Sequence, residues 1–216
     1  MHDIDRDATI LPLLRHLANR GFASAWANDH APVSKLAAEC SEIVNDVEWN
    51  STLGAYLRSR PIIRLSAETL LAQMAFTAGS RWQDTAPVLH PLSRRGWHIS
   101  RWLPTFLLVD GPLARFVRDP ESPLHMVLRA EPRRFPFLES ARDTFNHDLF
   151  RRIRNGFGHW SFVWNDDNAG SSITVYHWET GDEIAKLTLL EAEALHIFTF
   201  SVIDVFTHEI FERVNV

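Results

Sequence analysis

The 216-residue chain has the composition of an ordinary globular protein with a slightly acidic charge balance. Hydrophobic residues make up 45% of the sequence and charged residues 23%, which excludes wholesale disorder and predicts one well-buried domain or two small ones. The formal net charge is −5, so any contact with nucleic acid must come from a local basic patch and not from the overall field.

Several classes of site and location are excluded or disfavoured by simple motifs. The single cysteine, Cys40, excludes an intrachain disulfide and a zinc site built on several thiolates. We expect no metal and no cofactor, because the sequence contains no HExxH motif, no P-loop and no glycine-rich dinucleotide fingerprint. The start MHDIDRD is unlike a secretory signal and no stretch approaches 18 apolar residues, so we expect a cytoplasmic protein with no membrane partner.

Helical periodicity dominates residues 1–100, which we interpret as an N-terminal helical region of unknown role packed on the rest of the chain. Helices are predicted over 8–26 and 33–47, and Pro61 suits the first turn of a longer helix that reaches about residue 78. Residues 81–104 are irregular, which indicates a lid or a binding loop.

Residues 101–216 are predicted to form a helical domain that includes a small sheet. A long helix is expected from about Phe135 to Asn155. Along one edge of its apolar stripe runs a row formed by Asp143, His147, Phe150 and Arg154.

After this helix the hydrophobic period changes from 3.6 to 2. The change predicts an antiparallel β-hairpin or a three-stranded meander over about 160–187, with its tryptophans in packed core rather than in a base-stacking platform. Thr188 and Glu191 have capping-box spacing and predict the start of a final core helix that runs to about Arg213.

The junction RRIRNGFGHWSF, residues 151–162, holds the candidate catalytic residues. Four residues separate Arg154 from His159, and Asn155 directly follows the arginine. An imidazole exchanges protons near neutral pH, and a guanidinium stays cationic and binds two phosphate oxygens, so the pair suits RNA cleavage without a metal. Asn155 would fix either partner by a hydrogen bond or cap the helix.

Three further residues are candidates for substrate binding. Arg151 and Arg152 would add affinity for the RNA backbone, and His147 would assist from the helix face that it shares with Arg154. The competing interpretations are a basic last turn that complements the helix dipole, a structural His159 and a solvated His147.

The segment RNGFGH at 154–159 resembles the HEPN superfamily (higher eukaryotes and prokaryotes nucleotide-binding). The signature of that family is an arginine, four to six residues and a histidine, often with a polar residue after the arginine. The position of the segment between a long helix and a last core helix fits as well, and the resemblance covers about the last 110 residues.

The resemblance implies a mainly α, HEPN-like helical bundle and a metal-independent endoribonuclease. It also implies a homodimer in which two motifs form one composite site on an RNA substrate. Toxin and phage-defence effectors belong to this family, so an antitoxin or a regulatory protein is a further expected partner.

Two features keep other interpretations open. Gly156 and Gly158 each cost about 1 kcal/mol inside a helix, so we expect the helix to end at Asn155–Gly156 and His159 to lie on a turn or a strand start. Arginine–histidine pairs at such spacings also arise by chance. Four are present, formed by Arg118 and His125, Arg142 and His147, Arg152 and His159, and Arg154 and His159.

The alternative function is therefore a catalytically inactive HEPN-like domain that binds RNA, a nucleotide or a protein partner. A third is a structural helical protein in which the motif is a coincidence.

Overall fold

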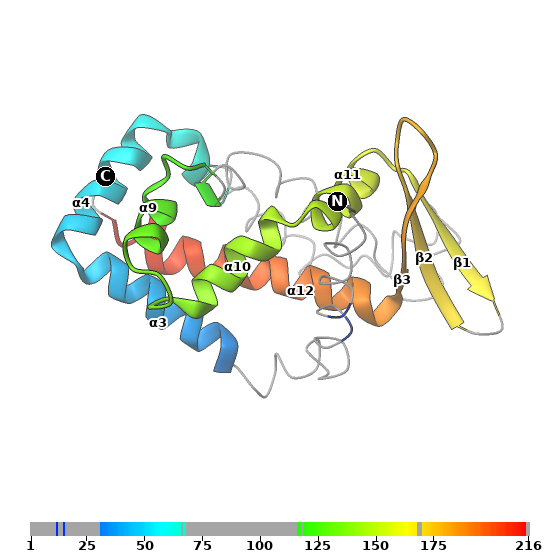
Figure 1. Ribbon diagram of the computed structural model, residues 1–216, viewed down its shortest axis with the longest axis horizontal. Helices are drawn as coiled ribbons and strands as arrows, with labels where there is room; N and C mark the ends of the chain where they lie inside the picture. The colour runs from blue at the N-terminus through cyan, green and yellow to red at the C-terminus, as the bar shows by residue number, and fades with distance from the viewer. Residues whose placement is uncertain are drawn as a thin grey trace, which may run out of the picture.

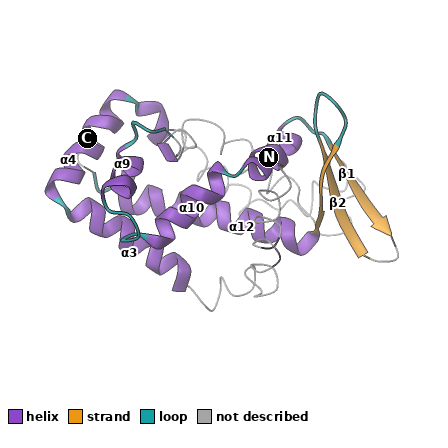
Figure 2. Cartoon of the chain, viewed as in Figure 1, coloured by secondary structure: helices purple, strands orange, loops and turns teal. Residues whose placement is uncertain are grey.

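The computed structural model describes residues 31–65, 67, 116–117, 119–167 and 170–214, together with Pro12 and Arg15. This part of the chain is mostly helical and has one antiparallel sheet with strand order β1-β2-β3, which confirms the expected mainly α class and the meander (Figures 1 and 2). The elements in chain order are α3 (Ala31–Asn45), α4 (Val47–Ser59), α9 (Pro123–Ala130), α10 (Pro136–Asn146), α11 (Asp148–Gly158), β1 (Phe162–Asp167), β2 (Gly170–Tyr176), β3 (Glu183–Thr188), α12 (Leu189–Val205) and η2 (Phe206–Phe211).

The last helix is the axis of the arrangement (Figure 1). α12 starts directly after β3 and runs away from the sheet, and η2 extends it as a π-helical turn. α3 packs against α12, η2 and α10, while α11 packs against β2 and β3 at the other end of the molecule. One hydrophobic core cluster contains residues from α3, α4, α9, α10, α11, the sheet and α12, so residues 31–59 belong to the same core as the C-terminal helices.

The start of α12 confirms the capping box. The Thr188 hydroxyl accepts from the Glu191 N–H at 3.2 Å, and the Glu191 carboxylate accepts from the Thr188 N–H at 2.8 Å. Both bonds satisfy backbone donors that the first turn of a helix leaves open. The Arg15 guanidinium lies 3.0 Å from the same carboxylate.

The hydrophobic pattern of the sequence does not predict α4, although Asp46 is a strong helix-start residue. Its carboxylate accepts from the backbone N–H groups of Glu48 and Trp49, at 3.0 Å each. Residues 61–65 are helical, as Pro61 indicates. Apart from Pro12 and Arg15, which are helical, the helix predicted over 8–26 lies outside the described residues, as do the irregular segment 81–104 and the domain boundary near residue 100.

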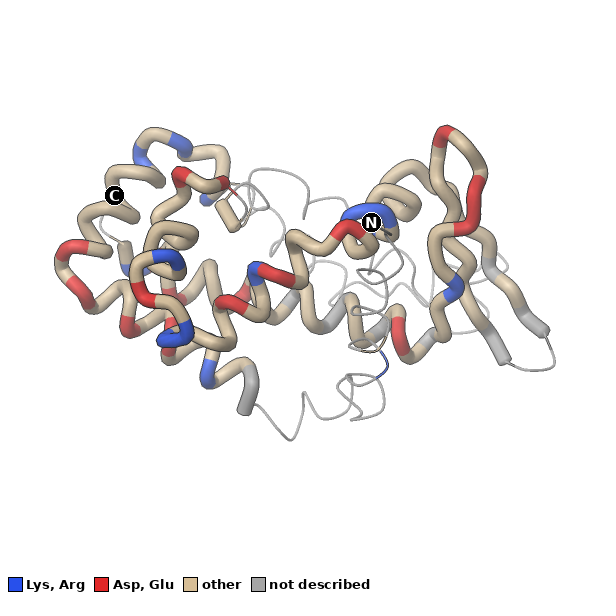
Figure 3. Tube along the Cα trace, viewed as in Figure 1, with Lys and Arg blue, Asp and Glu red and all other residues tan. Residues whose placement is uncertain are grey.

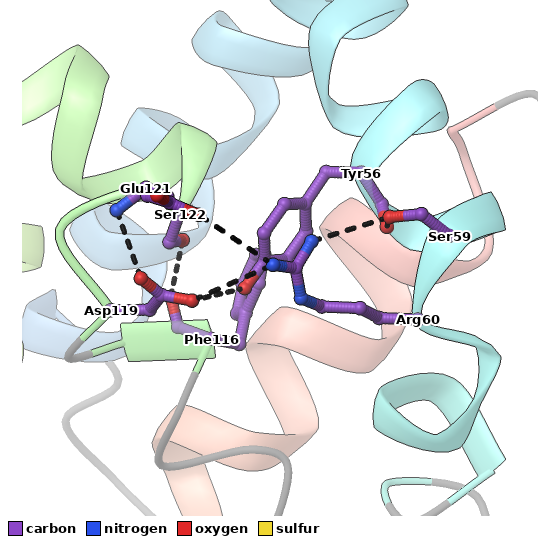
Figure 4. A network of polar contacts seen from close by, with 7 residues as sticks. All are labelled: Tyr56, Ser59, Arg60, Phe116, Asp119, Glu121 and Ser122. Atoms are coloured by element: carbon purple, nitrogen blue, oxygen red, sulfur yellow. Dashed lines mark hydrogen bonds and ion pairs between the residues drawn. The ribbon is translucent and has the colours of Figure 1, made fainter.

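A polar network joins the end of α4 to the residues before α9 (Figure 4). The Arg60 guanidinium lies over the Tyr56 ring at 4.3 Å, and the Tyr56 hydroxyl donates to Asp119 at 3.4 Å. Burial and the adjacent Asp119 carboxylate raise the pKa of Tyr56, so its hydroxyl stays a donor. The buried Ser122 hydroxyl donates to the Phe116 carbonyl and fixes the turn that precedes α9.

The single long helix predicted from Phe135 to Asn155 is wrong, because the chain breaks at His147. His147 adopts an extended conformation (φ −65°, ψ 132°), so it ends α10 and starts α11. In a continuous helix Phe145 and Phe150 would point about 140° apart. The break lets both rings enter the core, where they pack edge to face with centroids 5.3 Å apart.

The first turn of α10 is capped by a residue of another helix. Phe135 has no capping side chain, and the Glu39 carboxylate of α3 accepts instead from the N–H groups of Phe137 and Leu138, at 3.1 and 2.8 Å. Burial raises the pKa of Glu39, whereas these two backbone hydrogen bonds lower it. Glu39 therefore joins α3 to α10 at a helix terminus.

We predict that Glu39→Ala lowers the free energy of unfolding by about 1–2 kcal/mol, because it leaves two N–H groups of α10 without their acceptor. Urea denaturation measures the change. Glu42→Ala in the same helix is the matched control, since the Glu42–Arg134 ion pair is exposed and contributes little to the free energy of unfolding. Equal losses in both variants would show that Glu39 is only another surface carboxylate.

No helix in the described part of the chain combines the length and the apolar character needed to cross a membrane.

Candidate functional site

The candidate residues lie on α11 and on the turn that follows it. Helix α11 buries Leu149, Phe150, Ile153, Gly156 and Phe157. Arg154 is half-buried at one edge of this apolar face, as the sequence predicts for a charge at the boundary of the core, although it now belongs to the shorter helix. The helix places three arginines within its first two turns (Figure 3).

The helix does not end at Asn155–Gly156 as expected but continues to Gly158. It ends in a Schellman motif, in which the Ser161 N–H donates to the Gly156 carbonyl at 2.8 Å and the Trp160 N–H donates to the Phe157 carbonyl at 3.2 Å. His159 is the C-cap residue and leads into the turn, three residues before β1. The arginines therefore lie outside the last turn, which removes the dipole-complementing basic end as their explanation.

Gly156 lies inside the helix at the place where the sheet packs against it. A Cβ atom at this position would be 2.2 Å from Val175 Cγ1 and 3.0 Å from the Tyr176 carbonyl oxygen of β2. The next backbone bonds continue the contact, since the Ser161 carbonyl accepts from the Tyr176 N–H at 2.8 Å. The glycine that lowers helix propensity is the residue that lets α11 approach β2.

The C′ position of the Schellman motif is held by Trp160, with φ 58°. Glycine or asparagine normally occupies this left-handed position, and a larger residue there costs roughly 1–2 kcal/mol. The Trp160 side chain is 67% exposed, so burial of the indole offsets little of this cost. The ring stacks on Phe162 with centroids 6.1 Å apart.

Asn155 connects Arg154 with the face of the helix that carries His159. The Arg154 guanidinium donates to the Asn155 side-chain oxygen. Asn155 lies one turn before His159, and its backbone carbonyl accepts from the His159 N–H at 2.9 Å. Arg154 and His159 themselves point about 140° apart on the helix, whereas Asn155 and His159 point about 40° apart, so Arg154 is bonded to a side chain on the His159 face.

The two other arginines take different positions. Arg151 is exposed and its guanidinium lies 2.7 Å from the Asp148 carboxylate, one turn earlier. Arg152 precedes His159 by seven residues, which is close to two full turns, so these two residues share one face of α11. In the sequence, the Arg152–His159 pair is interpreted as a chance match to the motif. The helix nevertheless places Arg152 on the same face as the candidate residue His159.

The imidazole of His159 is exposed and stacks on a tryptophan of the β2–β3 turn. The His159 and Trp178 rings lie 4.5 Å apart with an interplanar angle of 19°. The turn that carries Trp178 is held by His177, whose Nδ1 accepts from the N–H groups of Glu179 and Thr180 at 3.4 and 3.3 Å. The sequence pattern does not indicate Trp178, because nothing in it connects two residues that are 19 positions apart.

His147, predicted to bind substrate, caps the start of α11. Its Nδ1 accepts from the Leu149 N–H at 3.3 Å, and its Nε2 is buried without a hydrogen-bond partner in the described part of the protein. The break in the helix also removes the shared row that linked it to Arg154. The geometry gives His147 a capping role, and its contact with substrate stays a prediction.

Within the described ranges no group of three His, Cys, Asp or Glu side chains is placed to hold a metal ion. Comparisons of the chain with protein-family models, with curated proteins and with solved structures find no significant match.

We predict that Gly156→Ala lowers the free energy of unfolding by about 1–3 kcal/mol, although alanine is the better helix former by about 1 kcal/mol, because the new methyl group overlaps Val175. Urea denaturation of both single variants and of Gly156→Ala/Val175→Ala checks the contact. The double variant should lose clearly less than the sum of the single losses. Additive losses would show that the two residues do not meet.

We also predict that His147→Ala lowers the melting temperature by roughly 2–4 °C, which corresponds to about 1 kcal/mol for loss of an N-cap. His147→Asn should retain the wild-type melting temperature, since asparagine is a preferred N-cap residue. Calorimetry measures both, and an asparagine variant as unstable as the alanine variant would contradict the capping role.

Proposed function

We propose that the protein is a metal-independent endoribonuclease of HEPN type that cleaves RNA as a homodimer, with Arg154 and His159 as its catalytic pair. The observation that carries the proposal is the Arg154–Asn155 bond, which joins the guanidinium to the residue one helical turn before His159. An effector of the toxin or phage-defence type, restrained by an antitoxin or another regulatory protein, is the cellular role that fits this activity.

The chemistry needs only groups that α11 and its turn supply. The 2′-oxygen of a ribose forms a bond with the adjacent phosphorus, and the bond from phosphorus to the 5′-oxygen breaks. A base removes the proton of the 2′-hydroxyl, and an acid donates a proton to the leaving 5′-oxygen. The products are a 2′,3′-cyclic phosphate and a 5′-hydroxyl. Arg154 stabilises the charge that develops on the phosphate oxygens.

The proposal assigns the base and the acid to two copies of His159. One imidazole cannot hold and release a proton in the same transition state, and two copies related by a two-fold axis supply both roles. His159 is suited to such a site because its ring is exposed, while stacking on Trp178 fixes its plane.

Arg151 and Arg152 would bind phosphates next to the cleaved bond. The Arg151–Asp148 pair is exposed, and such pairs contribute little stability, so a phosphate can replace the carboxylate at little cost. Arg152 lies on the His159 face and would contact the strand on the opposite side of the site from Arg154. Asn155 acts as a positioning residue through its bond to Arg154.

We predict that the protein cleaves single-stranded RNA in the presence of EDTA and that Arg154→Ala and His159→Ala each reduce the cleavage rate at least about 100-fold, as expected for loss of charge stabilisation or of proton transfer. Gel analysis of end-labelled RNA measures the rate and identifies the cyclic phosphate. Arg129→Ala and His208→Ala are the matched controls, because they remove an exposed arginine and an exposed histidine from other helices.

Circular dichroism must show that both site variants remain folded. Cleavage at the wild-type rate by either folded variant would rule out the proposed function. Absence of cleavage by the wild-type protein would remove it as well.

An inactive HEPN-like domain that binds RNA, a nucleotide or a protein is the second candidate function. The stacking of Trp178 on His159 favours it, because the indole covers one face of the imidazole. This candidate predicts that the wild-type protein binds RNA, nucleotide or a protein partner without forming products.

A further inference from the structure

Two exposed tryptophans flank His159. Trp160 directly follows it and is 67% exposed, and Trp178, which stacks on its imidazole, is 48% exposed. The sequence predicts packed core for the tryptophans of this region, so their exposure is a correction. Large aromatic rings left on the surface next to a candidate catalytic residue need an explanation outside the core.

The backbone conformation of Trp160 also indicates, independently of the exposure of its ring, that the ring has a role outside the core. Its positive φ belongs to a position where glycine fits without strain. A chain selected only for a stable helix end would carry glycine here. Strain that is kept at a surface position, and that presents an indole to solvent, indicates that the ring itself is used.

The charges differ between the two segments that carry these tryptophans, since the tube is blue over part of α11 and red over the β2–β3 turn (Figure 3). The arginines of α11 lie on the helix side, within about two turns of His159. On the other side the β2–β3 turn carries Glu179 and Asp182, both exposed. A nucleic acid strand would therefore lay its phosphates along α11 and direct its bases toward the indoles, because the acidic turn repels phosphate.

We propose that Trp160 and Trp178 form a stacking platform for unpaired bases of the RNA substrate. The inference rests on the proposed ribonuclease function, since it places the platform at the bond that His159 would cleave. An aromatic ring stacks on every base type, so the platform selects unpaired over paired RNA and has little sequence preference. A duplex keeps its bases stacked on one another and cannot offer them to Trp160.

The sharpest variant is Trp160→Gly, because it removes the ring and supplies the residue that the backbone conformation favours. Its melting temperature should equal or exceed that of the wild type, so loss of fold cannot explain its phenotype. Trp160→Phe retains a ring, and Val163→Ser removes a neighbouring exposed apolar side chain of β1 that is not aromatic.

The probe is a single-stranded 2′-O-methyl RNA, which cannot be cleaved because its 2′-oxygen is blocked. Fluorescence anisotropy measures its Kd for each variant. The same oligonucleotide with abasic positions, and its duplex form, are the comparison ligands.

We expect Trp160→Gly to weaken binding of the single strand roughly 5- to 100-fold, the range for loss of one base–aromatic stack. Trp160→Phe and Val163→Ser should stay within about threefold of the wild type. The abasic and duplex probes should bind the wild type weakly, and Trp160→Gly should not weaken them further.

Unchanged binding of the single strand by Trp160→Gly would overturn the platform, and so would equal binding of the abasic probe. If wild type cleaves RNA in that case, the ribonuclease proposal stands alone. If no variant cleaves RNA but binding depends on the bases and on Trp160, the platform stands and the ribonuclease proposal fails. Analytical ultracentrifugation covers a further outcome, because dissociation of a dimer by Trp160→Gly would make this surface a subunit interface and overturn the platform.

Discussion

The close approach of α11 to β2 at Gly156 is the constraint on which the candidate site depends. A methyl group at this position would overlap Val175, so only a residue without a side chain lets the helix lie against the strand. The same contact fixes where the chain goes next, because the Gly156 carbonyl accepts from Ser161 and the Ser161 carbonyl accepts from Tyr176. His159 and Trp160 lie inside this short loop of backbone bonds. Their positions therefore follow from packing between helix and sheet, and not from the helix alone.

The sequence predicts the parts of this fold that local patterns encode. The change of hydrophobic period marks the meander, and Thr188 with Glu191 marks the start of α12, since both signals lie within a few neighbouring residues. The break at His147 is not encoded in such a local pattern. Apolar residues continue on both sides of it with a spacing close to helical, and only the packing of Phe145 against Phe150 shows why the chain turns there. The capping role of Glu39 cannot be predicted from the sequence for a similar reason, because its partners in α10 lie far along the chain.

The candidate site likewise combines residues that local patterns predict with contacts that only tertiary packing decides. The motif identifies Arg154, Asn155 and His159, and the edge position of Arg154 follows from helical periodicity. Considered by themselves, the two glycines indicate a helix end. For Gly156, the packing of the sheet against the helix explains why a glycine is present. The contact between His159 and Trp178 arises only when the β2–β3 turn folds back on the end of α11, and Trp160 is exposed at the left-handed position that ends this helix. Local propensity cannot anticipate such a contact, because it is decided by tertiary packing.

The tryptophan in the left-handed backbone conformation at residue 160 also has a consequence at the level of the gene. The tryptophan codon UGG becomes the glycine codon GGG by a single base change, and that change would relieve the backbone at residue 160. A more relaxed helix end is thus always one mutational step away. Where related chains keep an aromatic residue at this position, selection must act against the change to glycine. The retained residue then shows for how long the ring has had a function.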